Sequence, residues 1–391
     1  MNKFLRIILF GALGLLLLCI AVVGISALNN RNLPTHSQVT DHLSDMEKAR
    51  LAEAIHLRQT LGEKVWPGWG LQDIPIIVYN EEYAFLLGYP NPPAGWEKMP
   101  QGELRGGAWE AVPKDSFEGQ IYYRQRLANP EITPENFTVR VGERWVATME
   151  TKEYMEVDFY TQFRKQVPSF FQPIFPYRQV WGLLMGPTET YIGGLEHETF
   201  HAFQGNEVPS RLAEAENVTR WESQYPWDSP ALDKDWQPEL DVLVRAVRAQ
   251  SNEETEDLAR QFLALRDKRR TIAGLNQDLM DYERQREWLE GLAKYAELSI
   301  GRLAGSTPDY KFLPALSGDP GFKEYSTSER YWSGQIDEVR RTGGREGEIR
   351  FYYSGMAQAV LLDRLLPDWK EKIFAPEVTL EDLLRQAVGQ P

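Results

Sequence analysis

Two histidines, His197 and His201, stand four positions apart with Glu198 between them, in the pattern H-E-x-x-H. On a helix, residues four apart lie on the same face, so both imidazoles can bind one ion, usually zinc. Glu198 is then close enough to act as a general base for the attacking water. The whole chain holds five histidines among 391 residues. The pattern would therefore rarely arise by chance, and it predicts a metal site.

A catalytic zinc ion usually has three protein ligands, so one more must come from elsewhere in the chain. No histidine follows His201, and the single cysteine, Cys19, lies in an apolar N-terminal segment. The third ligand is therefore expected to be a carboxylate. Glu290 is the best candidate, because the small residues after it would let another helix approach closely. Glu287, on the same expected helix, is the alternative ligand.

The segments around these residues resemble the aminopeptidase N family and its gluzincin relatives, whose motif is H-E-x-x-H-x-x-x-G-N followed by W-L-N-E-G-F-A-x-Y-x-E. The first part is matched by His197, Glu198, His201, Gly205 and Asn206. The second part is matched by Trp288, Leu289, Glu290, Gly291, Ala293, Tyr295 and Glu297. The family's Asn before the ligand glutamate is missing, and Leu292 replaces its Phe. The resemblance implies a zincin-like metallopeptidase body, one Zn²⁺ per chain and Glu290 as the third ligand.

A weaker match to the same family is the run Y-Y-S-G, which begins at Tyr352. In the family, the tyrosine of a Y-x-K-G segment donates a hydrogen bond to the oxyanion of the tetrahedral intermediate. The spacing to Gly355 selects Tyr352 for this role, and Tyr353 is its neighbour and rival. Ser354 stands where the family has Lys. An ordinary core or surface tyrosine is the alternative interpretation of both.

Two departures from the family concern the substrate. The segment between His201 and Glu290 is far longer than in the family and contains a helical insertion over residues 237–269. This insertion is expected to be either a structural hairpin or a lid that selects substrates. The family's amine-binding G-x-M-E-N segment is not found upstream, so the sequence does not decide between an exopeptidase and an endopeptidase.

The elements that must position these residues indicate an α+β body that is mainly helical. Pro187 and Thr188 predict the start of the motif helix, and Gly205 predicts its left-handed end. Apolar spacing predicts helices over residues 41–62, 237–250, 253–269 and 277–303. Strand-like runs occupy residues 74–79, 120–124 and 137–151, the last with a hairpin turn at Gly142. We therefore expect a mixed α/β portion over 31–152 and a mainly helical zinc-binding portion over 153–391.

Residues 1–30 are predicted to be a membrane anchor. Residues 7–28 form an almost unbroken apolar run, and the length of this run is about that of a transmembrane helix. Lys3 and Arg6 precede this run and place the N-terminus in the cytoplasm, with the body on the extracytoplasmic side. The alternative is a signal peptide cleaved before Ala27, since Gly24 and Ser26 are small enough for a cleavage site. In that case the body would be secreted.

Composition limits the remaining function classes. The formal net charge of −14 and the lack of a basic run argue against nucleic acid as a partner. The predicted function is a membrane-anchored zinc metallopeptidase that hydrolyses bonds in a peptide or protein substrate. The alternatives are a catalytically idle zincin-like scaffold or binding protein, and a zinc hydrolase of a non-peptide bond. The sequence indicates neither the substrate nor the oligomeric state.

Overall fold

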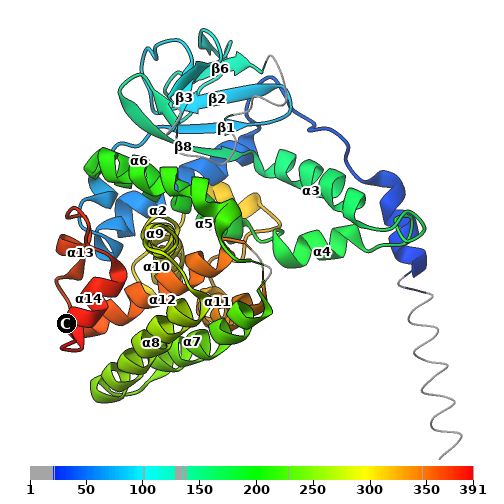
Figure 1. Cartoon of the computed structure of the whole chain (residues 1–391). Coiled ribbons are helices and arrows are strands. Elements are labelled where there is room, and N and C mark those ends of the chain that lie inside the picture. Colours follow the sequence, from blue (N-terminus) through cyan, green and yellow to red (C-terminus); the bar gives the residue numbers. More distant parts are fainter. Residues whose placement is uncertain are drawn as a thin grey trace, which may run out of the picture.

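The computed structural model describes residues 21, 23–99, 102–127, 134, 139–227, 229–345 and 347–390. Most of the predicted membrane anchor, residues 1–30, lies outside this range. Within the described residues, no helix has both the length and the apolar character that crossing a bilayer requires. Figure 1 shows a sheet packed on one side of a helical body, with an arm formed by α3 and α4 reaching away from it. The fold is thus mainly helical with one sheet, as predicted at this level.

The sheet has eight strands in the order β4-β3-β7-β8-β1-β2-β6-β5. The strands are β1 Ile76–Tyr79, β2 Tyr83–Leu87, β3 Trp96–Lys98, β4 Glu103–Arg105, β5 Glu110–Ala111, β6 Tyr123–Arg126, β7 Val139–Val141 and β8 Arg144–Glu150. β1 and β8 pair in parallel, and the other neighbours pair antiparallel. Side chains alternate between two faces: Ile76 and Val78 join the core of the helical body, whereas Ile77 joins a second cluster.

The helices make up the rest of the body. They are α2 Asp45–Val65, α3 Lys152–Gln166, α4 Tyr177–Leu184, α5 Thr188–Glu207, α6 Pro209–Asn217, α7 Pro230–Arg248, α8 Asn252–Ala273, α9 Gln277–Arg286, α10 Leu292–Ser306, α11 Ser328–Arg341, α12 Ile349–Leu365, α13 Trp369–Lys372 and α14 Leu380–Ala387. Helix α2 packs against α5 and α10 although it precedes the sheet in sequence. The Ser44 side chain caps α2 by accepting from the Glu47 amide, which places its start within the predicted helix of residues 41–62.

The helix predicted over residues 277–303 is present, with one irregularity around the candidate ligand Glu290. α9 and α10 are joined by a single π-helical turn, Glu287–Gly291. Such turns inside α-helices are rare and often occur at functional sites. The candidate ligand Glu290 lies in this turn, and we refer to it below as the π turn.

The predicted left-handed end of the motif helix at Gly205 is wrong, because α5 continues through Gly205 to Glu207. The glycine serves packing instead. A Cβ at this position would lie 2.4 Å from the Trp145 ring on β8. Gly205 therefore lets the sheet lie directly against the motif helix. Because glycine suits both a left-handed helix end and a close packing contact, the sequence alone did not distinguish the two roles.

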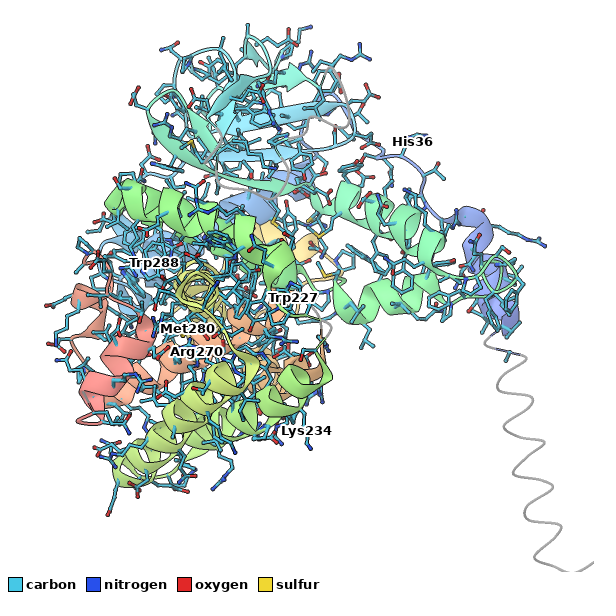
Figure 2. All side chains as sticks on the ribbon, viewed as in Figure 1. His36, Trp227, Lys234, Arg270, Met280 and Trp288 are labelled. Carbon is cyan, nitrogen blue, oxygen red and sulfur yellow. The ribbon has the colours of Figure 1, made fainter. Side chains whose placement is uncertain are left out.

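A buried cluster of three arginines and four glutamates lies inside the helical body, and we call it the arginine cluster. Its members are Arg266, Arg269 and Arg270 on α8, Glu239 on α7, Glu283 on α9, Glu287 in the π turn and Glu381 on α14. All seven are nearly inaccessible to solvent. Figure 2 labels Arg270 among the packed side chains of this region. The cluster therefore ties four helical segments and the π turn together through the interior.

The arginines in this cluster bind their partners in paired hydrogen bonds. Arg266 Nη1 and Nη2 donate to the two oxygens of Glu287 at 2.8 and 2.5 Å. Arg269 Nη1 and Nη2 donate to the two oxygens of Glu283 at 2.6 and 3.0 Å. Burial alone would raise the pKa of Glu283, but Arg269 and Arg270 hold it well below its usual range. The Glu283 carboxylate therefore stays ionised, as its paired hydrogen bonds require.

We expect Arg269→Met to lower the free energy of unfolding by about 3 kcal/mol or more, because it takes one guanidinium partner from each of two buried carboxylates. Arg260→Met is the matched control on the same helix. Arg260 forms exposed ion pairs with Glu256 and Asp257, so its loss is expected to cost less than about 1 kcal/mol. Chemical denaturation followed by circular dichroism measures both values. Equal losses in the two variants would contradict the role given to the cluster.

Candidate metal centre

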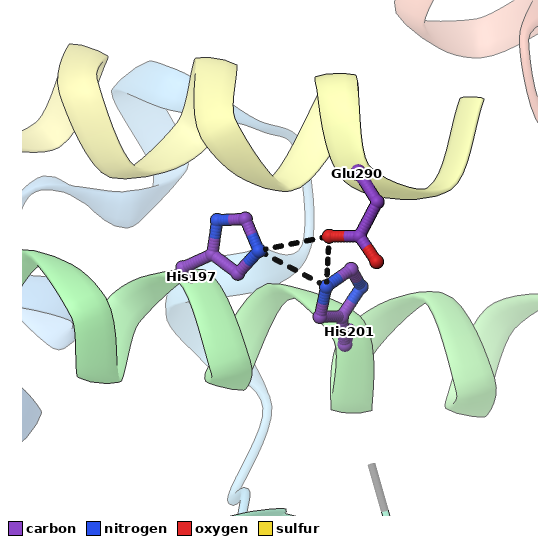
Figure 3. A group of neighbouring side chains, drawn as sticks. All are labelled: His197, His201 and Glu290. Carbon is purple, nitrogen blue, oxygen red and sulfur yellow. Dashed lines mark hydrogen bonds and ion pairs between the residues drawn. The ribbon is translucent and has the colours of Figure 1, made fainter. Parts of the chain in front are cut away.

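The side chains of His197, His201 and Glu290 meet between α5 and the π turn (Figure 3). The two Nε2 atoms are 3.1 Å apart, and Glu290 Oε2 lies 3.2 Å from His197 Nε2 and 3.3 Å from His201 Nε2. Three ligands placed tetrahedrally about 2.0–2.1 Å from a zinc ion would lie about 3.3 Å from one another. All three residues are buried. The group could therefore bind a metal ion, with a spacing that suits a small tetrahedral one.

Two glycines bring the neighbouring helix against the π turn. A Cβ on Gly291 would lie 2.5 Å from the Cα of Gly355 on α12, and a Cβ on Gly355 would lie 2.5 Å from the Glu287 carbonyl oxygen. Any larger residue at either position would push α12 away. The expectation that small residues after Glu290 allow close helix approach is thus confirmed at Gly291, and α12 is the helix that approaches.

The imidazole of His201 is held in one tautomer by Gln204. The Gln204 amide group Nε2 donates to the carbonyl oxygens of Trp288 and Leu289, at 3.2 and 3.4 Å. Its Oε1 therefore faces His201 Nδ1, at 2.9 Å, and accepts a hydrogen bond from the N–H group there. This leaves Nε2 of His201 with a free lone pair, which is the form that binds a metal.

The imidazole of His197 faces a carboxylate on its other side. His197 Nδ1 lies 3.3 Å from Glu297 Oε2, an ion-pair distance whose alignment falls short of a hydrogen bond. Glu297 Oε1 accepts from Lys294 Nζ at 2.6 Å, which fixes the carboxylate. A carboxylate behind a histidine raises the basicity of the opposite nitrogen and orients the ring. His197 therefore also presents Nε2 to the shared site.

The remaining oxygen of Glu290 is bound by an arginine from the preceding turn. Arg286 Nη2 donates to Glu290 Oε1 and to Glu348 Oε2, both at 2.7 Å. Oε2 of Glu290 is thereby left for the histidines. The alternative ligand Glu287 is not part of the group, because its carboxylate accepts from Arg266 and from the Ser354 hydroxyl.

The charges of the site favour a divalent cation. Burial raises the pKa of Glu198 to about 8; His197 opposes this shift, whereas Glu290, Glu216 and Glu297 add to it. These carboxyl groups repel one another across a small buried volume. A divalent cation among them would offset that repulsion, so the charge of the site as well as the donor set fits a metal.

The structure separates the two candidate tyrosines. The Tyr352 ring lies parallel to the His197 imidazole, with 5.7 Å between centroids and 7° between planes. Burial, with Glu290 beside it, holds the pKa of Tyr352 well above its usual range, so it keeps its proton and can donate. The Tyr353 hydroxyl donates instead to Gln335 Oε1 on α11, at 2.7 Å. Only Tyr352 is brought to the metal group.

An apolar pocket of about 130 Å³ lies beyond Glu297, between the first half of α5, α10 and α11. Glu297 and Gly193, one helical turn before His197, form its wall on the metal side. Its other lining is mostly apolar or aromatic and includes Leu57, Ile192, Leu298, Ile300, Tyr325 and Tyr331, together with the charged side chains of Glu189 and Arg302. This volume is close to the roughly 150 Å³ of a cavity that can hold a benzene ring. The pocket can therefore take one aliphatic or aromatic side chain.

Sequence reasoning missed the residues that orient the ligands. Gln204 stands three positions after His201, and Arg286 stands four positions before Glu290. Both spacings put side chains on the same helix face as the ligand they serve. The signal was therefore present in the helical spacing, but it required the identity of the ligands first.

Comparisons with protein-family models, with curated proteins and with solved structures find no match for this chain. The family resemblance of the two motif segments stays a prediction. It rests on the residues of those segments alone.

Gln204→Leu is expected to weaken zinc binding about 10–100-fold, because leucine cannot accept the hydrogen bond from His201 Nδ1–H that orients the ring. Competition with a chromophoric chelator measures the dissociation constant. Asn206→Leu is the control, since Asn206 lies two residues further along the helix and its side chain donates to Gln72 in a solvent-exposed position. Equal zinc affinities in the two variants would show that Gln204 does not orient the ligand.

Proposed function

We propose that this chain is a zincin-like zinc metallopeptidase, anchored in a membrane with its body on the extracytoplasmic side. The observation that carries the proposal is the buried convergence of His197, His201 and Glu290 at tetrahedral spacing, with Glu198 next to the first ligand. The resemblance of the same residues to the gluzincin motif supports it independently of geometry. Its substrate would be a peptide or a protein.

Zinc is the proposed metal, with one ion per chain. Two imidazoles and one carboxylate with an open fourth position form a ligand set typical of catalytic zinc. When bound, zinc would lower the pKa of a water molecule and polarise the scissile carbonyl. His197, His201 and Glu290 would hold it, and Gln204, Glu297 and Arg286 would orient these three ligands.

Two side chains of the protein would carry the proton and charge movements. Glu198 would accept the proton of the attacking water and pass it to the leaving amine as the C–N bond breaks. The raised pKa of its carboxyl group suits a residue that must both take and return a proton. Tyr352, which keeps its proton, would donate a hydrogen bond to the oxygen of the tetrahedral intermediate.

Glu198→Gln is expected to keep stoichiometric zinc and to lower kcat by about 10²–10⁴-fold, since glutamine cannot move the proton. Glu290→Ala is expected to lose the zinc. Metal analysis of purified protein and digestion of a diverse peptide library measure the two effects. If Glu290→Ala holds as much zinc as the wild type, the ligand set is wrong. If zinc is present and no peptide is cut in a Glu198-dependent way, the protein is an idle scaffold or acts on a non-peptide bond.

The pocket beside Glu297, on the Nδ1 side of His197, predicts a preference for substrates that extend past His197 and carry one bulky apolar side chain there. Gly301 lines this pocket, and a Cβ there would meet nothing within 4 Å. Gly301→Leu is therefore expected to fill the pocket and lower kcat/KM for such substrates about tenfold or more, relative to substrates with alanine there. Gly334→Leu, on α11 outside the pocket, is the control with the same change in helix propensity. If the ratio of kcat/KM between the two kinds of substrate changes equally in both variants, the pocket does not bind the substrate side chain.

A further inference from the structure

The arm of α3 and α4 is fixed to the stretch that follows the apolar N-terminal run. Asn30 Nδ2 lies 2.8–3.3 Å from the carbonyl oxygens of Gln172, Pro173 and Phe175 in the loop between the two helices. Arg178 donates to the Asn32 carbonyl at 2.7 Å. Leu33 is buried in the arm's own small core with Tyr160, Val167, Tyr177 and Trp181. The tip of the arm therefore lies level with residue 30, two positions after the apolar run ends.

Exposed apolar side chains gather at this tip. Phe170 and Phe171, in the α3–α4 loop, have 72% and 48% of their surface exposed, and their rings lie 4.2 Å apart. Five of the twelve exposed large apolar residues in the described part of the chain are here, and they are Val23, Ile25, Leu28, Phe170 and Phe171. Three of the five belong to the apolar run itself. The two phenylalanines add exposed apolar surface from a segment far away in sequence, in the loop to which Asn30 is bonded.

The charge of the same region is the reverse of the charge of the whole chain. Residues 29–33 and 161–182 contain four basic residues and no acidic ones, in a chain with a formal net charge of −14. The four are Arg31, Arg164, Lys165 and Arg178. Basic residues beside an apolar tip attract anionic lipid headgroups. The tip therefore suits a surface that is both apolar and anionic, and its contacts with Asn30, directly after the apolar run, place an anionic bilayer beside it.

We propose that the arm tip is a second membrane contact, in which Phe170 and Phe171 enter the interfacial layer of the bilayer that the N-terminal run enters. The contact rests on the proposed anchor and goes beyond it, because a single anchor leaves the body free to rotate whereas a second contact fixes its tilt. α3 has 15 residues and is about 22 Å long. The arm thus holds the body, with its metal group, away from the lipid at a set orientation (Figure 1).

The test uses the full chain in vesicles of phosphatidylcholine and phosphatidylglycerol, with one environment-sensitive fluorophore per molecule. Cys19 is the only cysteine of the chain, so Cys19→Ser combined with Phe170→Cys labels the tip alone. Ile121→Cys in the same background is the control, because Ile121 is 63% exposed and lies in the sheet portion. Phe171→Cys repeats the measurement at the second ring. Spin-labelled lipids and aqueous iodide serve as quenchers.

We expect lipid quenchers to remove most of the emission at position 170 and iodide to remove little, with the reverse at position 121. Iodide quenching at position 170, or shielding from both quenchers as a protein partner would produce, would overturn the proposal. A label on Cys19 of the wild-type chain reports the anchor separately. Lipid quenching at Cys19 without lipid quenching at position 170 would leave the anchor standing and remove the arm contact. The zinc content of the same samples reports the metal site independently of both.

Discussion

The bidentate pair between Arg266 and Glu287 is the contact on which the metal centre depends most. Glu287 opens the π turn, and Glu290 follows in the same turn, so the contact that holds Glu287 also fixes the position of the backbone that carries Glu290. Arg266 is in turn held by Glu239 on α7. The α7–α8 hairpin lies between the two motif segments in sequence. It therefore supports, from behind, the π turn that carries the third ligand. This placement favours the structural role of the insertion over a lid.

A second constraint acts from the opposite side of the π turn, where Gly291 and Gly355 let two backbones touch. This contact brings Tyr352, one turn before Gly355, beside His197. The family-like glycines in both segments therefore have one physical explanation. Both glycines are needed, because a side chain on Gly291 would collide with the backbone at Gly355, and a side chain on Gly355 would collide with the backbone of the π turn.

The sequence predicted the parts of the molecule that depend on local spacing. The H-E-x-x-H helix, the helices of the insertion and the buried strands β1 and β8 follow from periods of about 3.6 and 2 residues. Short strands such as β5 were missed because two residues with exposed side chains carry no periodic signal. The arginine cluster was missed for a different reason. On the helical pattern of α8, Arg266 and Arg269 belong to a polar face, and only their distant partners, as far away as Glu381, show that this face is buried.

The buried charges raise the question of why this body uses ions where apolar packing would serve. Replacing a buried ion network by apolar residues of similar volume is often neutral or stabilising, so stability alone does not explain the cluster. Apolar contacts are non-directional, whereas a bidentate arginine–carboxylate pair fixes both distance and angle. A metal site needs its ligands within about 0.5 Å of their required positions. Glu290 lies in a π turn, a rare irregularity within a helix. Directional contacts at Glu287 and from Arg286 hold this turn and its ligand in place.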